Sequence, residues 1–166
     1  DADPALHADL VENFIRIYEE AFDLTTLYPH VSTTLLALAE AGHRLAICTN
    51  KPEGPARAVL RHFDLAPLFP VLIGGDTLPQ RKPDPAPLHA ALDRLGPGKA
   101  LFIGDSEVDA ETAAAAGVSL ALFTGGYCKA APDKLGARII FDDHAALPGL
   151  VTHLAPRLAP VLAPNA

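Results

Sequence analysis

The chain has 166 residues, of which 49% are hydrophobic and 20% are charged, a balance that fits one globular unit with enough apolar material for a core. The formal net charge of −7 argues against nucleic acid as a partner, because Lys and Arg do not gather into the positive stripe that a phosphate backbone requires. No apolar run reaches the roughly 18 to 20 residues that span a bilayer, and no signal segment opens the chain, so we expect a cytoplasmic protein without a membrane partner.

The first part of the chain is predicted to be helical. Apolar residues spaced three and four apart indicate an amphipathic helix over residues 5–22, which Asp3 and Pro4 begin. A second helix is expected over residues 31–41, ended by Gly42, and the short apolar strand R-L-A-I-C-T-N follows it.

From there helices and strands alternate. Helices are predicted at 53–63, 85–95 and 106–116, and strands at 70–76, 100–105, 119–126 and 137–143. Strands that are short and continuously apolar are typical of a sheet buried on both faces, so this pattern predicts an α/β fold whose parallel sheet carries helices on each side. Residues 155–166 form a tail rich in Ala and Pro.

Polar residues follow three of the predicted strands directly. In open α/β sheets ligands bind outside the carboxyl ends of the strands, so these residues are the candidates for a site. They are Thr49, Asn50 and Lys51 after the first strand, Lys82 in the R-K-P-D-P segment after the second, and Asp105, Ser106 and Asp109 after the third.

Each candidate also has a structural interpretation. S-E-V-D is a capping box in which Ser106 caps the helix and Asp109 reaches back, and Thr49 and Asn50 are common turn formers. Lys82 could be a solvated loop side chain. The capping box does not account for Asp105, which precedes the cap at the end of a buried strand, where an unpartnered carboxylate is costly. A bound cation explains Asp105 better, and both interpretations of Asp109 stay open.

In their order after three strands, I-C-T-N-K, R-K-P-D-P and F-I-G-D-S-E-V-D resemble the second, third and fourth motifs of the haloacid dehalogenase superfamily. Within it, the stretch from Tyr28 to Asp143 is most similar to the phosphoglycolate phosphatases. The resemblance implies a three-layer Rossmann-like core with a parallel sheet over residues 28–154, preceded in residues 1–27 by the remnant of a helical C1-type cap.

The resemblance also implies a function for the candidate residues. Thr49 and Asn50 would hold the phosphoryl oxygens, Lys82 would neutralise phosphate and nucleophile, Asp105 would bind Mg²⁺, and Asp109 would orient Lys82 or the metal shell. The activity implied is Mg²⁺-dependent hydrolysis of a small phosphate monoester, 2-phosphoglycolate by likeness, through an aspartyl-phosphate. Mg²⁺ suits the pattern because it keeps several waters and needs only one or two carboxylates.

The sequence departs from the family at the nucleophile. The first motif, a strand followed by D-x-D-G-T, is not found in it. Neither D-A-D-P at the start nor Asp23 replaces this motif, because no strand is predicted before them and Thr25 stands where the acid/base carboxylate would be. We therefore expect the chain to be the C-terminal portion of a phosphatase, with its nucleophile upstream.

The missing motif has consequences for the fold and for the function. In the family, its strand lies between the strands that end here at Thr49 and Asp105, so its absence would leave two inner edges unpaired. A non-catalytic fragment that binds phosphate or Mg²⁺ and a related phosphomutase are the alternative functions. A phospho-accepting receiver domain is disfavoured, because its acceptor Asp precedes Thr and Lys in the chain, whereas Asp105 follows both.

Overall fold

The computed structural model describes residues 25–154 and 160–161. The main elements are α2 (Val31–Glu40), β1 (Ala46–Cys48), α3 (Glu53–His62), β2 (Val71–Ile73), α4 (Ala86–Leu95), β4 (Leu101–Gly104), α5 (Glu107–Ala116), β5 (Ser119–Phe123), β6 (Ile139–Phe141) and α6 (Leu147–Leu154). Two short strands, β3 (Gly98–Lys99) and β7 (Pro160–Val161), pair antiparallel. The predicted helix over 5–22 lies outside the described residues, and the division into cap remnant, core and tail stays a prediction.

The helices and strands predicted between residues 31 and 143 are confirmed, each somewhat shorter than expected. The sequence did not predict α6, whose first turn contains Pro148 and Gly149, residues that usually interrupt helices. Proline is tolerated there because the first turn has no partner for its missing N–H group. No helix within residues 25–154 has both the length and the apolar character needed to cross a membrane.

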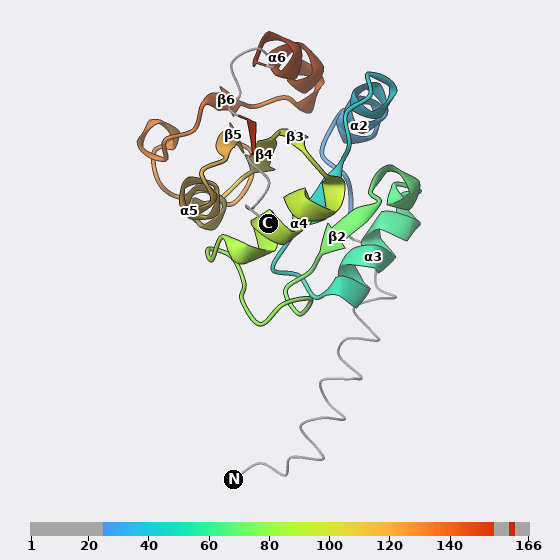
Figure 1. Ribbon diagram of the computed structural model, residues 1–166. Coiled ribbons are helices and arrows are strands. Elements are labelled where there is room, and N and C mark those ends of the chain that lie inside the picture. The colour runs from blue at the N-terminus through green and yellow to red at the C-terminus, as the bar shows by residue number, and fades with distance from the viewer. Residues whose placement is uncertain (1–24, 155–159, 162–166) are drawn as a thin grey trace.

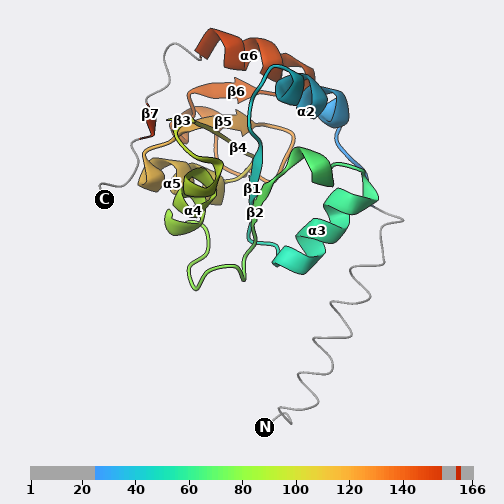
Figure 2. The same cartoon turned by 45° about the vertical axis from the view of Figure 1, so that its right-hand side comes forward.

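The strands form parallel sheets, as the apolar runs predicted. β5 lies between β4 and β6 and is parallel to both, with Phe102 opposite Leu120 and Ala121 opposite Ile139. β1 pairs in parallel with β2 in a separate two-stranded sheet. Helices α4 and α5 lie on one side of the strands, and α6 lies on the other side together with α2 (Figures 1 and 2).

Alternation along β5 produces the two apolar layers of the core. Leu120 and Leu122 pack into a cluster that includes side chains of α4 and α5, whereas Ala121 and Phe123 pack with β6 and α6. Because neighbouring residues of a strand point to opposite faces, the four apolar residues 120–123 of β5 can serve both layers. The three-layer Rossmann-like α/β architecture that the sequence predicted is confirmed.

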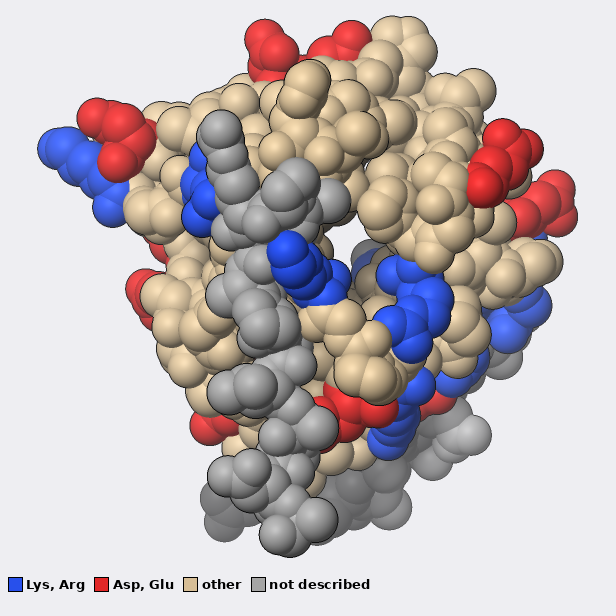
Figure 3. Space-filling view, turned by 45° about the horizontal axis from the view of Figure 1, so that its top comes forward, with Lys and Arg blue, Asp and Glu red and all other residues tan. Residues whose placement is uncertain are grey.

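The two parallel sheets lie beside each other without joining. Among the described residues, β1 has β2 as its strand partner and β4 has β5, so the inner edges of β1 and β4 are unpaired. Burial reflects this break: Ile73 of β2 is fully buried, whereas the side chain of Ile103 in β4 is 40% exposed. The space-filling view shows an opening that passes through the molecule (Figure 3).

Candidate active site

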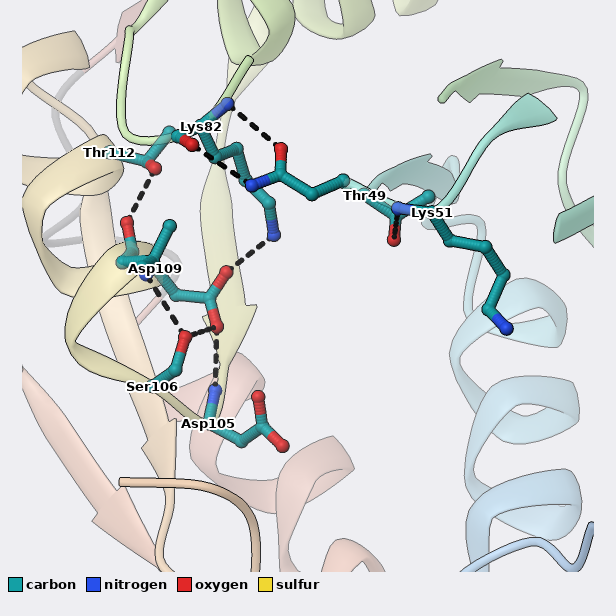
Figure 4. Close-up of polar contacts among 9 residues, drawn as sticks. Thr49, Lys51, Lys82, Asp105, Ser106, Asp109 and Thr112 are labelled. Carbon is teal, nitrogen blue, oxygen red and sulfur yellow. Dashed lines mark hydrogen bonds and ion pairs between the residues drawn. The ribbon is translucent and has the colours of Figure 1, made fainter. Parts of the chain in front are cut away.

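The candidate residues come from the carboxyl ends of the two sheets. Thr49 and Asn50 directly follow β1, Lys82 lies in the loop between β2 and α4, and Asp105 directly follows β4. Figure 4 shows Lys82, Asp105 and Asp109 close to one another, with Thr49 across the space between the sheets. The ammonium group of Lys51 points away from this space (Figure 4).

An ion pair between Lys82 and Asp109 is at the centre of the site. The Lys82 Nζ donates to Asp109 Oδ1 at 2.6 Å, and the two side chains are only 12% and 6% exposed. The same Nζ lies 5.6 Å from the centroid of the Phe102 ring, which adds a cation–π contact. Lys82 is therefore a fixed, largely buried cation and not the solvated loop side chain of the alternative interpretation.

Asp109 also completes the start of α5. Its main-chain N–H donates to the Ser106 hydroxyl oxygen at 3.3 Å, and its Oδ2 accepts from that hydroxyl at 2.6 Å and from the Asp105 N–H at 3.1 Å. Burial raises the pKa of the Asp109 carboxyl, but the hydrogen bonds from Lys82 and Ser106 outweigh it, so its pKa lies below the ordinary value. Asp109 therefore caps α5 and pairs with Lys82 at the same time, and its role in an active site stays a prediction.

Asn50 holds the main chain of Lys82. Its side-chain Nδ2 donates to the Lys82 carbonyl at 2.9 Å, and its Oδ1 accepts from the Lys82 N–H at 3.0 Å. The loops approach closely here, because a Cβ on Gly75 would lie 2.2 Å from the Asn50 carbonyl oxygen. The polar atoms of the Asn50 side chain are thus engaged by Lys82, and its predicted contact with phosphoryl oxygens stays a prediction.

Thr49 is placed by the end of β1. Its N–H donates to the Ile73 carbonyl at 2.9 Å, which extends the pairing with β2 by one residue. The Thr49 hydroxyl oxygen accepts from the Lys51 N–H at 3.1 Å, a turn contact of the kind that the structural interpretation predicted. The hydroxyl hydrogen stays available to donate to a ligand, so a phosphoryl contact is compatible with this turn.

Asp105 has the environment that a metal ligand would need. Burial, and then the neighbouring Asp109 carboxylate, raise the pKa of Asp105. Lys82 pairs with Asp109 and leaves the Asp105 carboxylate as a hard oxygen donor at the strand end. Within residues 25–154 no three His, Cys, Asp or Glu side chains cluster closely enough to hold a metal. Asp105 fits Mg²⁺ as one protein ligand of an ion that keeps its waters.

A loop that the sequence did not assign to the site packs against Asp105. The Tyr127 N–H donates to the Asp105 carbonyl at 3.1 Å, and Glu107 Oε1 accepts from the N–H groups of Lys129 and Ala130 at 2.7 and 2.6 Å. The paired glycines of the segment A-L-F-T-G-G-Y-C-K were the available signal, because glycine permits close backbone approach.

Comparison with known proteins agrees with this geometry. A family model described as a haloacid dehalogenase-like hydrolase matches residues 2–117, which is most of the chain. The chain belongs to the haloacid dehalogenase-like hydrolase family. The predicted resemblance to this family is confirmed.

Relatives within the haloacid dehalogenase-like hydrolase family are named as phosphatases. A phosphoglycolate phosphatase of Cereibacter sphaeroides is 46% identical over 149 residues, which cover 89% of this chain and 68% of that protein. A phosphoglycolate phosphatase of Rhodospirillum rubrum is 52% identical over 124 residues, which cover 74% of this chain and 52% of that protein. The prediction that the chain belongs to a phosphatase is confirmed.

A solved structure shares the fold. The crystal structure of a predicted phosphoglycolate phosphatase from Haemophilus somnus superimposes with a TM-score of 0.79 at 31% sequence identity, covering 91% of this chain and 69% of that one. The haloacid dehalogenase-like core that the resemblance of the three motifs implied is therefore also found by comparison of structures.

Proposed function

We propose that this protein is a Mg²⁺-dependent phosphate monoester hydrolase that acts on 2-phosphoglycolate through an aspartyl-phosphate. The observation that carries the proposal is the buried pair in which Lys82 Nζ lies 2.6 Å from Asp109, next to the half-buried Asp105 at the end of β4. The names of the relatives from Cereibacter sphaeroides and Rhodospirillum rubrum support the substrate.

The residues of this chain would supply positive charge and orientation. Phosphoryl transfer depends mainly on in-line positioning and on charge around the equatorial oxygens. Asp109 holds the Lys82 ammonium in place and Asn50 holds the Lys82 main chain, so the cation would be preorganised for these oxygens. The Thr49 hydroxyl would donate to one of them. Mg²⁺ bound by Asp105 would add charge stabilisation, and the nucleophile is assigned to none of the described residues.

Release of phosphate from 2-phosphoglycolate tests the proposal. Because the nucleophile motif D-x-D-G-T is not among the 166 residues, the assay uses a polypeptide that carries this motif ahead of them. We expect its phosphate release to need Mg²⁺, to stop with EDTA, and to fall by about 100-fold or more in Lys82→Ala, because a preorganised charge at the reacting group is lost. Lys134→Ala is the matched control, because Lys134 is an exposed lysine far along the chain. Unchanged release in Lys82→Ala would contradict the proposal.

A non-catalytic fragment that binds phosphate or Mg²⁺ is the second candidate, favoured by the absence of D-x-D-G-T from the 166 residues. Such a fragment would bind inorganic phosphate, lose this binding in Lys82→Ala, and release no phosphate from 2-phosphoglycolate. A phosphomutase would share Thr49, Lys82 and Asp105, and it would differ by transferring the phosphoryl group within the sugar phosphate without net release of inorganic phosphate.

A further inference from the structure

The loop of residues 125–130, which follows β5, is attached to the start of α5 at two places. At one place, the Tyr127 N–H donates to the carbonyl oxygen of Asp105 at 3.1 Å. At the other, Glu107 Oε1 accepts from the N–H groups of Lys129 and Ala130 at 2.7 and 2.6 Å. These attachments lie on either side of Ser106 and join segments about twenty residues apart in sequence.

Glu107 is well suited to hold this loop. One of its carboxylate oxygens, Oε1, receives the main-chain N–H groups of both Lys129 and Ala130. Hydrogen bonds to an ionised acceptor are about twice as strong as neutral ones. The Cys128 thiol contributes a longer contact to the same oxygen at 3.8 Å.

The held loop packs directly on the Asp105 side chain. A Cβ added to Gly126 would lie 2.2 Å from Asp105 Oδ2 and 2.3 Å from Asp105 Cβ, so the bare glycine backbone lies against the carboxylate. No larger residue would fit there without moving the Asp105 side chain or the loop. The position of the loop therefore limits the rotamers that the Asp105 carboxylate can adopt.

We propose that Glu107 is a positioning residue that acts through loop 125–130 to hold the Asp105 carboxylate in one orientation. Glu107 fixes the amides of Lys129 and Ala130, the loop places Gly126, and Gly126 confines Asp105. The inference deepens the proposed function, on which its consequence for Mg²⁺ affinity rests. Its consequence for the loop and for the Asp105 rotamer stands independently of any metal.

Nuclear magnetic resonance of the full chain in EDTA tests the first step. In Glu107→Ala we expect exchange of the Lys129, Ala130 and Tyr127 amides to accelerate by about tenfold or more, and Asp105 to change from one χ1 rotamer to an average of several. The exchange rate of the Tyr127 amide decides the question, because this amide donates to Asp105 and not to Glu107. Faster exchange at Lys129 and Ala130 alone, with one Asp105 rotamer retained, would overturn the proposal.

Three further variants sharpen the test. Glu107→Gln keeps an acceptor oxygen and should largely restore the slow exchange and the single rotamer. Glu111→Ala removes an exposed glutamate one turn along the same helix and should change neither. Gly126→Ala should disturb the Asp105 rotamer directly while the Lys129 and Ala130 amides stay protected, because the Glu107 contacts remain.

Titration with Mg²⁺ alone, followed by calorimetry, tests the second step. Residues that orient a metal ligand typically change metal affinity by about 10- to 100-fold, so we expect Glu107→Ala to bind Mg²⁺ about tenfold more weakly than the unaltered chain and Glu111→Ala to bind it equally well. Equal affinity in Glu107→Ala would overturn the proposal. If the unaltered chain bound no Mg²⁺, the proposed function would fail, and the exchange and rotamer measurements would still decide the role of Glu107.

Discussion

Asp109 connects the charge of Lys82 to the fold, because one carboxylate serves both an ion pair and a helix start. Its Oδ1 pairs with Lys82, while its Oδ2 accepts from Ser106 and from the Asp105 N–H. A residue with both functions is constrained twice: removing the charge would leave a largely buried ammonium without its partner, and removing the oxygen would also weaken the turn that places Asp105.

Asp109→Asn should lower the free energy of unfolding by about 3 kcal/mol at pH 7, because breaking a buried ion pair leaves an uncompensated charge. Urea unfolding would measure the loss. The control is the double variant Lys82→Met with Asp109→Asn. Its loss in free energy of unfolding should be clearly smaller than the sum of the losses in the two single variants. Strictly additive losses would show that the pair carries no coupling energy.

His144 provides a pH-dependent contribution on the opposite face of the β5 sheet. The centroid of its ring lies 4.3 Å from that of Phe123 and 5.6 Å from that of Phe141. Burial is the largest effect on the pKa of His144 and lowers it; Asp143 raises this pKa and His30 lowers it, each by less than burial does. Because the folded-state pKa is below the unfolded value of about 6.5, protonation favours unfolding. The contribution of neutral His144 is complete above about pH 6.5 and is lost as the pH falls toward the folded-state pKa.

We therefore expect His144→Phe to flatten the dependence of the free energy of unfolding on pH below about pH 6.5, where the lowered pKa makes the folded state lose stability. His43→Phe, at an exposed histidine, is the control for replacing a histidine by phenylalanine. Chemical denaturation at several pH values would give both slopes. The same slope in His144→Phe and in the unaltered chain would contradict the assignment.

At the scale of elements, the loops after β1 and β2 can meet because glycine occupies the contact. The Gly75 N–H donates to the Lys51 carbonyl at 2.9 Å, and a Cβ at Gly75 would clash with the Asn50 carbonyl. Asn50 in turn binds both main-chain polar groups of Lys82. These contacts therefore place the Lys82 ammonium beside Asp109: Gly75 packs on Asn50, and Asn50 holds the main chain of Lys82.

Gly75→Ala tests this packing, and Gly149→Ala is the comparison at a glycine with open space around it. Gly75→Ala should destabilise the chain by about 1 to 3 kcal/mol, the range expected for overpacking, and should displace Asn50. Gly149→Ala should stabilise it by about 0.5 to 1 kcal/mol, because Gly149 lies inside α6 with nothing within 4 Å of an added Cβ. Thermal unfolding would compare them, and a neutral Gly75→Ala would mean that the loops separate freely.

At the scale of the whole molecule, the described core is divided between two sheets. The inner edges of β1 and β4 are unpaired among residues 25–154, and Ile103 on β4 is 40% exposed. Unpaired, apolar strand edges are sites where other chains can pair. The division lies where the family resemblance places another strand, between the strands that end at Thr49 and Asp105.

For the 166-residue chain we expect self-association that increases with concentration and decreases in Ile103→Lys, because a charge on an open edge opposes strand pairing. Leu36→Lys, at a residue of α2 that is 48% exposed, is the matched control for added charge. Light scattering combined with size-exclusion chromatography would measure the association. An equal decrease in both variants would indicate an effect of net charge rather than of the β4 edge.

The sequence by itself determined the order of helices and strands between residues 31 and 143 and the three polar segments at the strand ends. These features are local: apolar periodicity, caps such as Ser106 and terminal glycines such as Gly117 act over a few residues and can be read in one pass. The local pattern did not predict α6, because the packing of Leu147 and Val151 outweighs the helix-breaking tendency of Pro148 and Gly149.

Only the tertiary structure decided how these residues are used. The Lys82–Asp109 pair, the binding of the Lys82 main chain by Asn50 and the attachment of loop 125–130 to Glu107 join residues 20 or more positions apart. Such contacts depend on where whole strands and loops lie, so neither residue of a pair signals the other in sequence. The division of the sheet between β1 and β4 is decided in the same way, because strand pairing is a property of neighbours in space.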